Sequence, residues 1–332
     1  MNPETRKKIE LLHQVGSWLN AHDEEWQRIK FKAIGKNAWF TEEHIDYAVK
    51  SICNEFLEKE KLTNWVKNYS TTTSPKTIGI VMAGNIPLVG FHDFLCLFLS
   101  GHKARIKLSS KDEELMKGIF NYMCDLYPAA KDQVVFDERI AGCDAYIATG
   151  SNNTSRYFEQ YFGNVPNIIR KNRTSVALLT GNESENDLEA LADDIYMFYG
   201  LGCRNVTQVL VPKKYNFEPL VNACKRHNHY ADLNKYKNNY DYHLALYLLN
   251  RVPYMSNDSL LLVENDMPFS AVSVLHYKYY ENLEKEIERL KTDENIQAIV
   301  GSDFIPFGKS QSPQLNSYAD GVDTMAFLSS LG

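Results

Sequence analysis

The 332-residue chain lacks several features that mark specialised classes of protein. No apolar run reaches the roughly 20 residues that cross a bilayer, so we expect no membrane span. The first eight residues lack the apolar segment of a signal peptide, and we expect a cytoplasmic protein. Acidic residues outnumber basic ones by 42 to 36, and the net charge of −6 argues against a nucleic-acid partner.

The chain also lacks closely spaced pairs of cysteines and a glycine-rich sequence motif. The six cysteines form no Cys-x-x-Cys pair and show no metal-ligand spacing with histidine, so we predict no metal site. In the cytoplasm their thiols are reduced. The chain contains no Gly-x-Gly-x-x-Gly sequence, so an ordinary nicotinamide-dependent dehydrogenase lacks its usual signature here.

What is present is the composition of a globular α/β protein, with 44% hydrophobic and 23% charged residues. Residues 1–68 show the apolar spacing of helices, and from residue 77 onward short β-rich segments alternate with helical patterns. In the first half we expect strands at 77–82, 101–108, 133–136 and 145–148, with helices at 88–99 and 113–126 and from about 152. In the second half we expect strands at 206–211, 260–263, 271–275 and 298–300, with helices ending near 198 and 290. This alternation predicts a parallel, doubly wound sheet.

The stretch Gly200-Leu201-Gly202-Cys203 lies where an expected amphipathic helix meets an expected strand. Glycines let the backbone turn tightly and let a substrate carbonyl approach the sulfur and the neighbouring N–H groups. Such a junction can hold a nucleophilic thiolate beside amides that stabilise an oxyanion. The alternative is a small buried hydrophobic cysteine, and these residues alone leave both interpretations open.

A second candidate is Thr149-Gly150-Ser151, which follows an expected strand and precedes an expected helix. Free N–H groups and the helix dipole make such a position suitable for a pyrophosphate. The alternative is a glycine that merely turns the chain at a crossover.

In order and spacing these segments resemble the aldehyde dehydrogenase superfamily, and within it the acyl-CoA reductases of bacterial bioluminescence operons (LuxC-like). The resemblance runs from about Ile78 to the C-terminus. The matching segments are Gly84–Leu88, Lys107–Ser110, Thr149–Ser151, Gly200–Cys203 and Asp266–Tyr277. The implied fold has two lobes, each with a mostly parallel sheet flanked by helices, and a shortened N-terminal part.

The resemblance also implies roles for single residues. Cys203 matches the nucleophile, and the amide of Asn85 matches a donor to the oxyanion. Asp266 stands roughly where the family has a carboxylate on the nicotinamide ribose. By the same resemblance, the adenosine ribose of the cofactor contacts Lys107, Ser109 and Ser110. The cofactor phosphates contact Gly150 and Ser151.

Two departures from the aldehyde-oxidising members bear on the reaction. The stretch Ile168–Asn172 corresponds to their Glu-Leu-Gly-Gly motif but contains no carboxylate to activate water. A thiol ionises by itself near pKa ~8.5, so thioester exchange with coenzyme A suits such a site better than hydrolysis. Ser110 replaces a glutamate that repels a 2′-phosphate, and basic residues at 103, 105 and 107 are near in sequence. NADPH is therefore the expected cofactor, with NADH as the alternative, unless Ser110 only caps the next helix.

We expect reduction of an acyl-CoA, a fatty acyl-CoA among the candidates, or of another acyl thioester, to an aldehyde by NAD(P)H, with coenzyme A as the leaving group. The expected divisions are an NAD(P)-binding part at 1–175, a catalytic part at 176–310 and a tail at 311–332 that packs back on the core. The alternatives are a conventional aldehyde dehydrogenase and a non-catalytic nucleotide-binding relative. An acyl-protein donor, a homo-oligomer and an acyl-transferring synthetase partner stay open by family resemblance.

Overall fold

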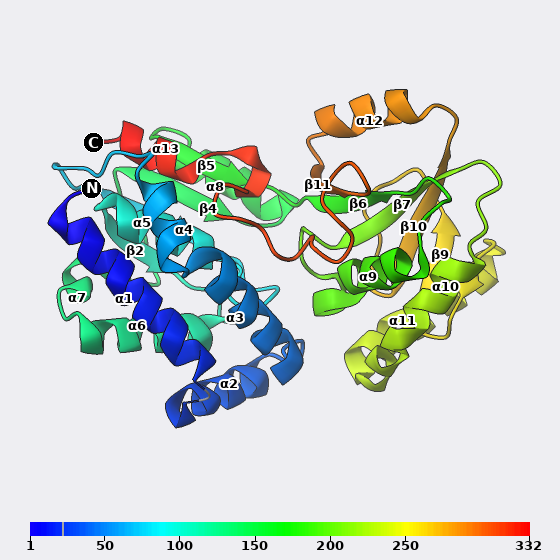
Figure 1. Cartoon of the computed structure of the whole chain (residues 1–332), viewed down its shortest axis with the longest axis horizontal. Helices are drawn as coiled ribbons and strands as arrows, with labels where there is room; N and C mark the ends of the chain where they lie inside the picture. The colour runs from blue at the N-terminus through cyan, green and yellow to red at the C-terminus, as the bar shows by residue number, and fades with distance from the viewer. Residues whose placement is uncertain (22) are drawn as a thin grey trace. The chain divides into compact units, whose positions relative to one another are not determined.

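The computed structural model describes residues 1–21 and 23–332, and the chain divides into two compact units (Figure 1). Unit 1 comprises Met1–Asn172 together with Ser312–Gly332, and unit 2 comprises Arg173–Gln311. Within the described part of the chain, no helix is both long and apolar enough to cross a membrane.

Unit 1 begins with helices, as the apolar spacing of residues 1–68 predicts. The four helices are α1 (Pro3–Asn20), α2 (Glu24–Lys36), α3 (Glu42–Phe56) and α4 (Lys59–Val66). Three of them begin at a side chain suited to the cap position, because Asn2, Asp23 and Thr41 each accept a backbone N–H of the first turn. Their apolar faces are buried in the core of unit 1.

The sheet of unit 1 has five strands, which are β1 (Thr77–Val81), β2 (Lys103–Lys107), β3 (Val134–Phe136), β4 (Ala145–Thr149) and β5 (Asn167–Arg170). They pair in the order β3-β2-β1-β4-β5, and every pair is parallel. The order therefore reverses between β1 and β4, which is the arrangement of a doubly wound sheet.

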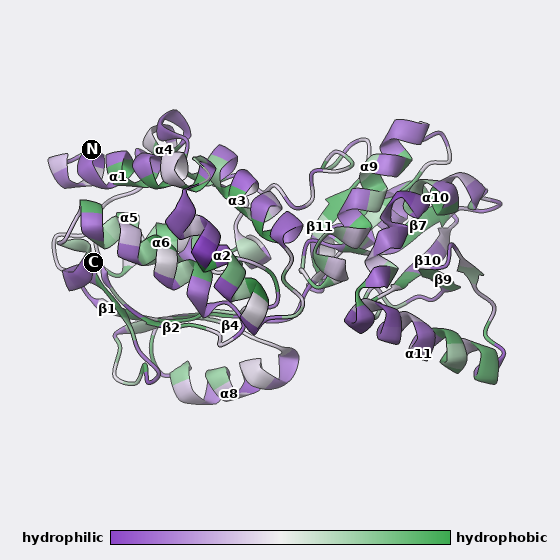
Figure 2. Ribbon diagram, turned by 90° about the horizontal axis from the view of Figure 1, so that it is seen from below, coloured by the Kyte–Doolittle hydropathy of each residue, from purple (hydrophilic) through white to green (hydrophobic). Residues whose placement is uncertain are grey.

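Helices cover both faces of this sheet, as Figure 2 shows for α8 on one face and α5 and α6 on the other. The remaining helices of unit 1 are α5 (Phe91–Ser100), α6 (Glu113–Leu126), α7 (Ala130–Gln133), α8 (Asn152–Phe162), the short η3 (Ala319–Gly321) and α13 (Thr324–Ser330). Nearly every side chain of α5 is buried, because this helix is enclosed between the sheet and the N-terminal helices.

Unit 2 has a second, six-stranded sheet. Its strands are β6 (Thr174–Leu178), β7 (Val206–Pro212), β8 (Met255–Ser256), β9 (Leu261–Glu264), β10 (Val274–Tyr280) and β11 (Ile296–Val300). They pair in the order β11-β6-β7-β10-β9-β8, and only the pair β8–β9 is antiparallel. The helices are α9 (Glu185–Tyr196), η1 (Met197–Gly200), α10 (Glu218–Cys224), η2 (Lys225–Asp232), α11 (Asn234–Asn250) and α12 (Leu283–Thr292).

The structure differs from the sequence-based expectation at several elements. The polar stretch after residue 228 holds the 17-residue helix α11, and the strands β5 and β6 were not expected. The strand expected at 271–275 begins only at Val274 and continues to Tyr280. Its start is delayed because Ser273 has a φ of 64°, which no regular strand accommodates.

Candidate active site

Three of the predicted segments lie together at the carboxyl edge of the sheet in unit 1. Since the strands are parallel and β1 lies between β2 and β4, the chain leaves all three strands at the same edge. Asn85 follows β1, Lys107 ends β2, and Gly150 follows β4. Open α/β sheets bind their ligands at this edge, where the strand order reverses.

The loop after β1 packs directly on the turn after β2. The N–H of Met82 donates to the carbonyl oxygen of Lys107 over 3.0 Å. A Cβ on Gly84 would lie 2.6 Å from the hydroxyl oxygen of Ser109, so only glycine allows this approach. The Ser109 hydroxyl accepts the N–H of Lys111 and so belongs to its own turn, whereas Ser110 is exposed.

Helix α6 begins after Asp112, so Ser110 is not its cap residue. The alternative reading of Ser110 as a helix cap is therefore wrong. An exposed Ser110 at the carboxyl edge is compatible with the cofactor role that the resemblance implies.

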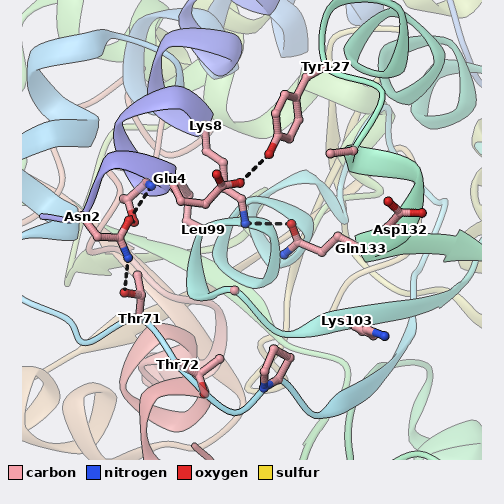
Figure 3. A pocket seen from close by; sticks show the side chains of 14 residues that line it. Asn2, Glu4, Lys8, Thr71, Thr72, Leu99, Lys103, Tyr127, Asp132 and Gln133 are labelled. Atoms are coloured by element: carbon pink, nitrogen blue, oxygen red, sulfur yellow. Dashed lines mark hydrogen bonds between the residues drawn. The ribbon is translucent and has the colours of Figure 1, made fainter.

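The three basic residues of β2 do not act as a group. Lys107 is exposed at the carboxyl end, but Arg105 donates to the carbonyl oxygen of Ala141 over 3.1 Å and its Nε lies 3.5 Å from Asp137. Lys103 begins the strand, about 13 Å from Lys107 at the usual rise per residue. There it lines a separate cavity of about 330 Å³ at the opposite edge (Figure 3).

Helix α8 starts immediately after β4 at Thr149-Gly150-Ser151, as the sequence predicts. Ser151 is the N-cap, and its hydroxyl oxygen accepts the N–H of Thr154 over 3.3 Å. A Cβ on Gly150 would lie 2.9 Å from the ring of Phe158, so the glycine lets the helix pack closely on the strand. This start, with Ser151 exposed, fits a pyrophosphate at the helix N-terminus.

Cys203 lies in unit 2, in the turn between η1 and β7. Helix α9 begins with a capping box formed by Ser184 and Asp187, as expected. After α9 the chain makes a sharp reversal in which Phe198, Tyr199 and Gly200 have φ values of 54°, 57° and 74°. Two consecutive non-glycine residues in the left-handed region are strained, and such strain persists only where the surrounding contacts enforce it.

Several of those contacts come from the side chain of Asn205, which is fully buried. Its Oδ1 accepts the N–H of Gly202 over 2.8 Å, and its Nδ2 donates to the carbonyl oxygens of Met197 at 2.7 Å and Asp194 at 3.1 Å. The hydroxyl of Ser175 on β6 donates to the carbonyl oxygen of Cys203 over 3.1 Å. The cysteine is therefore held in a turn that is fixed to both α9 and β6.

Cys203 is the only partly exposed cysteine of the six, all of which lie in the described part of the chain. Burial raises the pKa of the others, to about 12 for Cys53 and Cys224, so these thiols are unreactive. Next to Cys203, desolvation lowers the pKa of the Arg204 guanidinium, and the charge of Cys203 acts in the opposite direction. A neighbouring cation stabilises a thiolate.

Asp266 is exposed on the loop between β9 and β10. Buried side chains hold the backbone of this loop over the start of β7. Nε2 of Gln208 donates to the carbonyl oxygen of Asn265 over 2.8 Å, and the Thr207 hydroxyl donates to the carbonyl oxygen of Pro268 over 2.6 Å. The loop that carries Asp266 is thus attached to the strand that directly follows the Cys203 turn.

The structure therefore brings the predicted residues together in two sets. Asn85, Lys107, Ser109, Ser110, Gly150 and Ser151 belong to unit 1, whereas Cys203 and Asp266 belong to unit 2. The supporting residues Asn205 and Gln208 were not predicted from the sequence. Their only signal is that each is a polar residue at or inside an apolar strand. Among the described residues, no group of three or more His, Cys, Asp or Glu side chains could hold a metal ion.

Comparison with solved structures identifies the fold as that of aldehyde dehydrogenases. A putative aldehyde dehydrogenase from Burkholderia cenocepacia is 14% identical, with a TM-score of 0.63 over 90% of this chain and 75% of that one. Aldehyde dehydrogenase 21 from Physcomitrella patens, solved with the product succinate, is 12% identical with a TM-score of 0.67, over 91% and 74%. An aldehyde dehydrogenase from Mycobacterium tuberculosis, complexed with NAD+, is 12% identical with a TM-score of 0.62, over 86% and 70%. The predicted fold class, in which mostly parallel sheets are flanked by helices, is confirmed.

A match to a protein-family model assigns the chain to one family among the proteins with this fold. The model described as acyl-CoA reductase (LuxC) matches residues 3–223, and the chain belongs to that family. The match begins well before Ile78, so the N-terminal helices are part of the family pattern. A search of curated proteins finds no match. The protein is thus an oxidoreductase acting on aldehyde or acyl groups.

Proposed function

We propose that the protein reduces an acyl thioester, with acyl-CoA as the donor, to an aldehyde through an acyl-enzyme on Cys203. The observation that carries the proposal is the state of this cysteine. It alone among the six is partly exposed, and it stands in a strained turn beside a cationic side chain. Membership in the acyl-CoA reductase family supports the choice of a thioester as substrate.

In the proposed reaction the Cys203 thiolate attacks the thioester carbonyl, and the C–S bond to coenzyme A breaks, so that a new thioester forms on the protein. Coenzyme A leaves as a thiolate. The N–H of Cys203 and the amide of Asn85 are the proposed donors to the oxyanion, the latter from the family resemblance. Loss of one such donor typically lowers turnover by about a hundredfold or more.

The carboxyl edge of unit 1 fits a nicotinamide dinucleotide. The close packing at Gly150 and the N-cap Ser151 suit the pyrophosphate, and the turn at Lys107, Ser109 and Ser110 suits the adenosine ribose. Bound NAD(P)H supplies the hydride that converts the acyl group to an aldehyde. Because Ser110 brings no negative charge and Lys107 is exposed nearby, we propose NADPH as the preferred form, with Asp266 on the other ribose.

The absence of a general base beside β5 favours reduction over oxidation to an acid. Residues 168–172 contain no carboxylate, and the guanidinium of Arg170 is buried, where it donates to the carboxylate of Asp93 and to the hydroxyl of Thr324. Asp93 is therefore committed to an ion pair. Without an activated water the acyl-enzyme persists until hydride transfer or thiol exchange.

Mass spectrometry and product analysis test the proposal. Incubated with acyl-CoA alone, the wild type should gain one acyl group, and Cys203→Ala should gain none. With acyl-CoAs of graded chain length, oxidation of NADPH should yield aldehyde and free coenzyme A. An adduct that persists in Cys203→Ala refutes the assignment of the nucleophile. Acid formation from aldehyde and NAD(P)+ without coenzyme A would instead show a conventional aldehyde dehydrogenase.

A further inference from the structure

Asp112 occupies the N-cap position of α6 but does not cap that helix. An aspartate at this position usually accepts an N–H of its own first turn. Here Oδ2 instead accepts the N–H of Leu88 over 2.6 Å, in the loop between β1 and α5. The carboxyl group is thus directed away from its own helix and onto the segment that carries Asn85.

The residue that it contacts has an unfavourable backbone conformation. Leu88 is buried and has a φ of 56°, in the left-handed region that a leucine rarely adopts. Such a conformation costs free energy of about 1–3 kcal/mol and persists only where neighbouring groups enforce it. The bond from the Leu88 N–H to Asp112 is one such restraint, at the end of the loop that precedes α5.

The other end of the same segment is fixed by the same turn. A Cβ on Gly84 would lie 3.2 Å from the Cβ of Asp112 and 2.6 Å from the hydroxyl of Ser109. The N–H of Asp112 donates to the carbonyl oxygen of Ser109 over 3.0 Å, so these two residues form one turn. The loop from Gly84 to Leu88 is therefore held at both ends by the turn that follows β2, and exposed Asn85 lies between these two points.

Packing alone does not explain why a carboxyl group, that of Asp112, is buried at this position. Asp112 is 5% exposed, and its second oxygen, Oδ1, is buried without a hydrogen-bond partner among the described residues. This burial raises the pKa of Asp112 well above its usual value, and the N–H of Leu88 only partly opposes the rise. An apolar side chain would fill the same space without burying an unpaired carboxyl oxygen. What an apolar side chain cannot provide is the acceptor for the Leu88 N–H.

We propose that Asp112 is a positioning residue for the proposed reaction, which fixes Asn85 by accepting the N–H of Leu88 and touches neither substrate nor cofactor. The proposal rests on the role of Asn85 in the proposed function. It predicts that the carboxyl group acts on turnover only through Asn85, and that an acceptor oxygen at this position, charged or neutral, is sufficient.

Two substitutions of similar volume separate the acceptor from the bulk of the side chain. Asp112→Asn keeps an oxygen that accepts the Leu88 N–H, and its turnover should stay within about threefold of the wild type. Asp112→Leu removes the acceptor and should lower kcat by at least about tenfold, because a misplaced oxyanion donor loses most of its effect. KM for acyl-CoA and for NADPH should change by less than about twofold, since only a transition-state interaction is lost.

A double-mutant cycle distinguishes positioning from general damage. If Asp112 acts through Asn85, then Asp112→Leu should lower kcat by less than about twofold in an Asn85→Ala background. An equal loss in both backgrounds, or an unchanged kcat in Asp112→Leu, overturns the proposal. If Asp112→Leu does not fold, hydrogen exchange decides the question in the wild type: the Leu88 amide should be protected, and exchange as fast as in a peptide overturns the proposal.

The same experiments separate this proposal from the function on which it rests. Acylation of Cys203 by acyl-CoA, followed to completion by mass spectrometry, should be retained in Asp112→Leu. If the wild type itself takes up no acyl group, the proposed function fails. If the wild type is acylated but Asn85→Ala keeps full turnover, the roles of Asn85 and Asp112 fail while the thioester reaction stands.

Discussion

Replacing Asn205 by leucine tests whether one buried amide holds the turn that carries Cys203. The substitution keeps a similar volume but removes every hydrogen bond of the side chain. Gly202 loses the acceptor of its N–H, and the carbonyl oxygens of Met197 and Asp194 lose their donor. No water replaces these partners easily, because Asn205 is fully buried.

The expected loss follows from the number of bonds. Each buried hydrogen bond contributes about 1 kcal/mol net, and groups left unpaired add to the penalty, so the free energy of unfolding of unit 2 should fall by about 3 kcal/mol or more. For a domain of this size that corresponds to a melting temperature lower by roughly 9 °C. The variant should still fold, since domains are typically stable by about 5–15 kcal/mol.

Urea unfolding, followed by fluorescence and circular dichroism, measures this loss. A matched control is Asn250→Leu, which removes a single bond of 2.8 Å from an exposed asparagine to the carbonyl oxygen of Leu246. The control should change the free energy of unfolding by less than about 0.5 kcal/mol. A loss below about 1 kcal/mol in Asn205→Leu would refute the idea that this amide holds the turn.

Three further predictions concern single side chains. Asn85→Ala should lower turnover by about a hundredfold with cofactor binding nearly unchanged; a variant that melts early but keeps its turnover would make Asn85 a purely structural turn residue. Ser110→Glu should weaken NADPH binding by roughly 1–2 kcal/mol and spare NADH, and equal losses in a fluorescence titration would exclude position 110 from reading the ribose. Burial raises the pKa of Asp194 from 3.8 to about 6, so the folded chain holds this proton to higher pH than the unfolded chain. The stabilising effect of that proton is complete below about pH 4 and is lost as the pH rises through 6. The free energy of unfolding of Asp194→Asn should therefore rise relative to that of the wild type between pH 4 and 7. A difference between the two free energies of unfolding that does not change with pH would contradict this.

The sequence predicted the elements whose boundaries are set by local signals. Helix α6 begins and ends at the expected Glu113 and Leu126, because its apolar spacing is regular and acidic residues fill its first turn. Helix α8 begins at Asn152, as expected from the Gly-Ser that precedes it. In both cases the information lies within a few residues of the boundary.

Helix α11 could not be predicted in the same way. Its first half is rich in asparagine, lysine and tyrosine, and only Tyr236 and Tyr240 of the whole helix are buried. In its second half leucines lie on exposed as well as on packed positions, so no apolar face is visible in the sequence. The start of β10 is equally hidden, because the left-handed Ser273 depends on its surroundings.

The surroundings of the candidate site depend even more on tertiary contacts. Phe198 and Tyr199 are residue types that avoid the left-handed region, and they adopt it here in a turn held by Asn205, which lies six or more residues later. Asp112 and Leu88 are 24 residues apart and meet only because β1 and β2 are neighbours. The assignments of the site residues themselves stay predictions until the variants are measured.

The unequal burial of the cysteines has a practical consequence. Five of the six thiols are enclosed in the folded chain, and the sixth is the proposed nucleophile. A chromogenic disulfide reagent should therefore consume about one equivalent of thiol per native chain and all six per unfolded chain. The stoichiometry counts the accessible Cys203 thiol before denaturant is added and then reports the unfolded fraction during denaturation, without any introduced label.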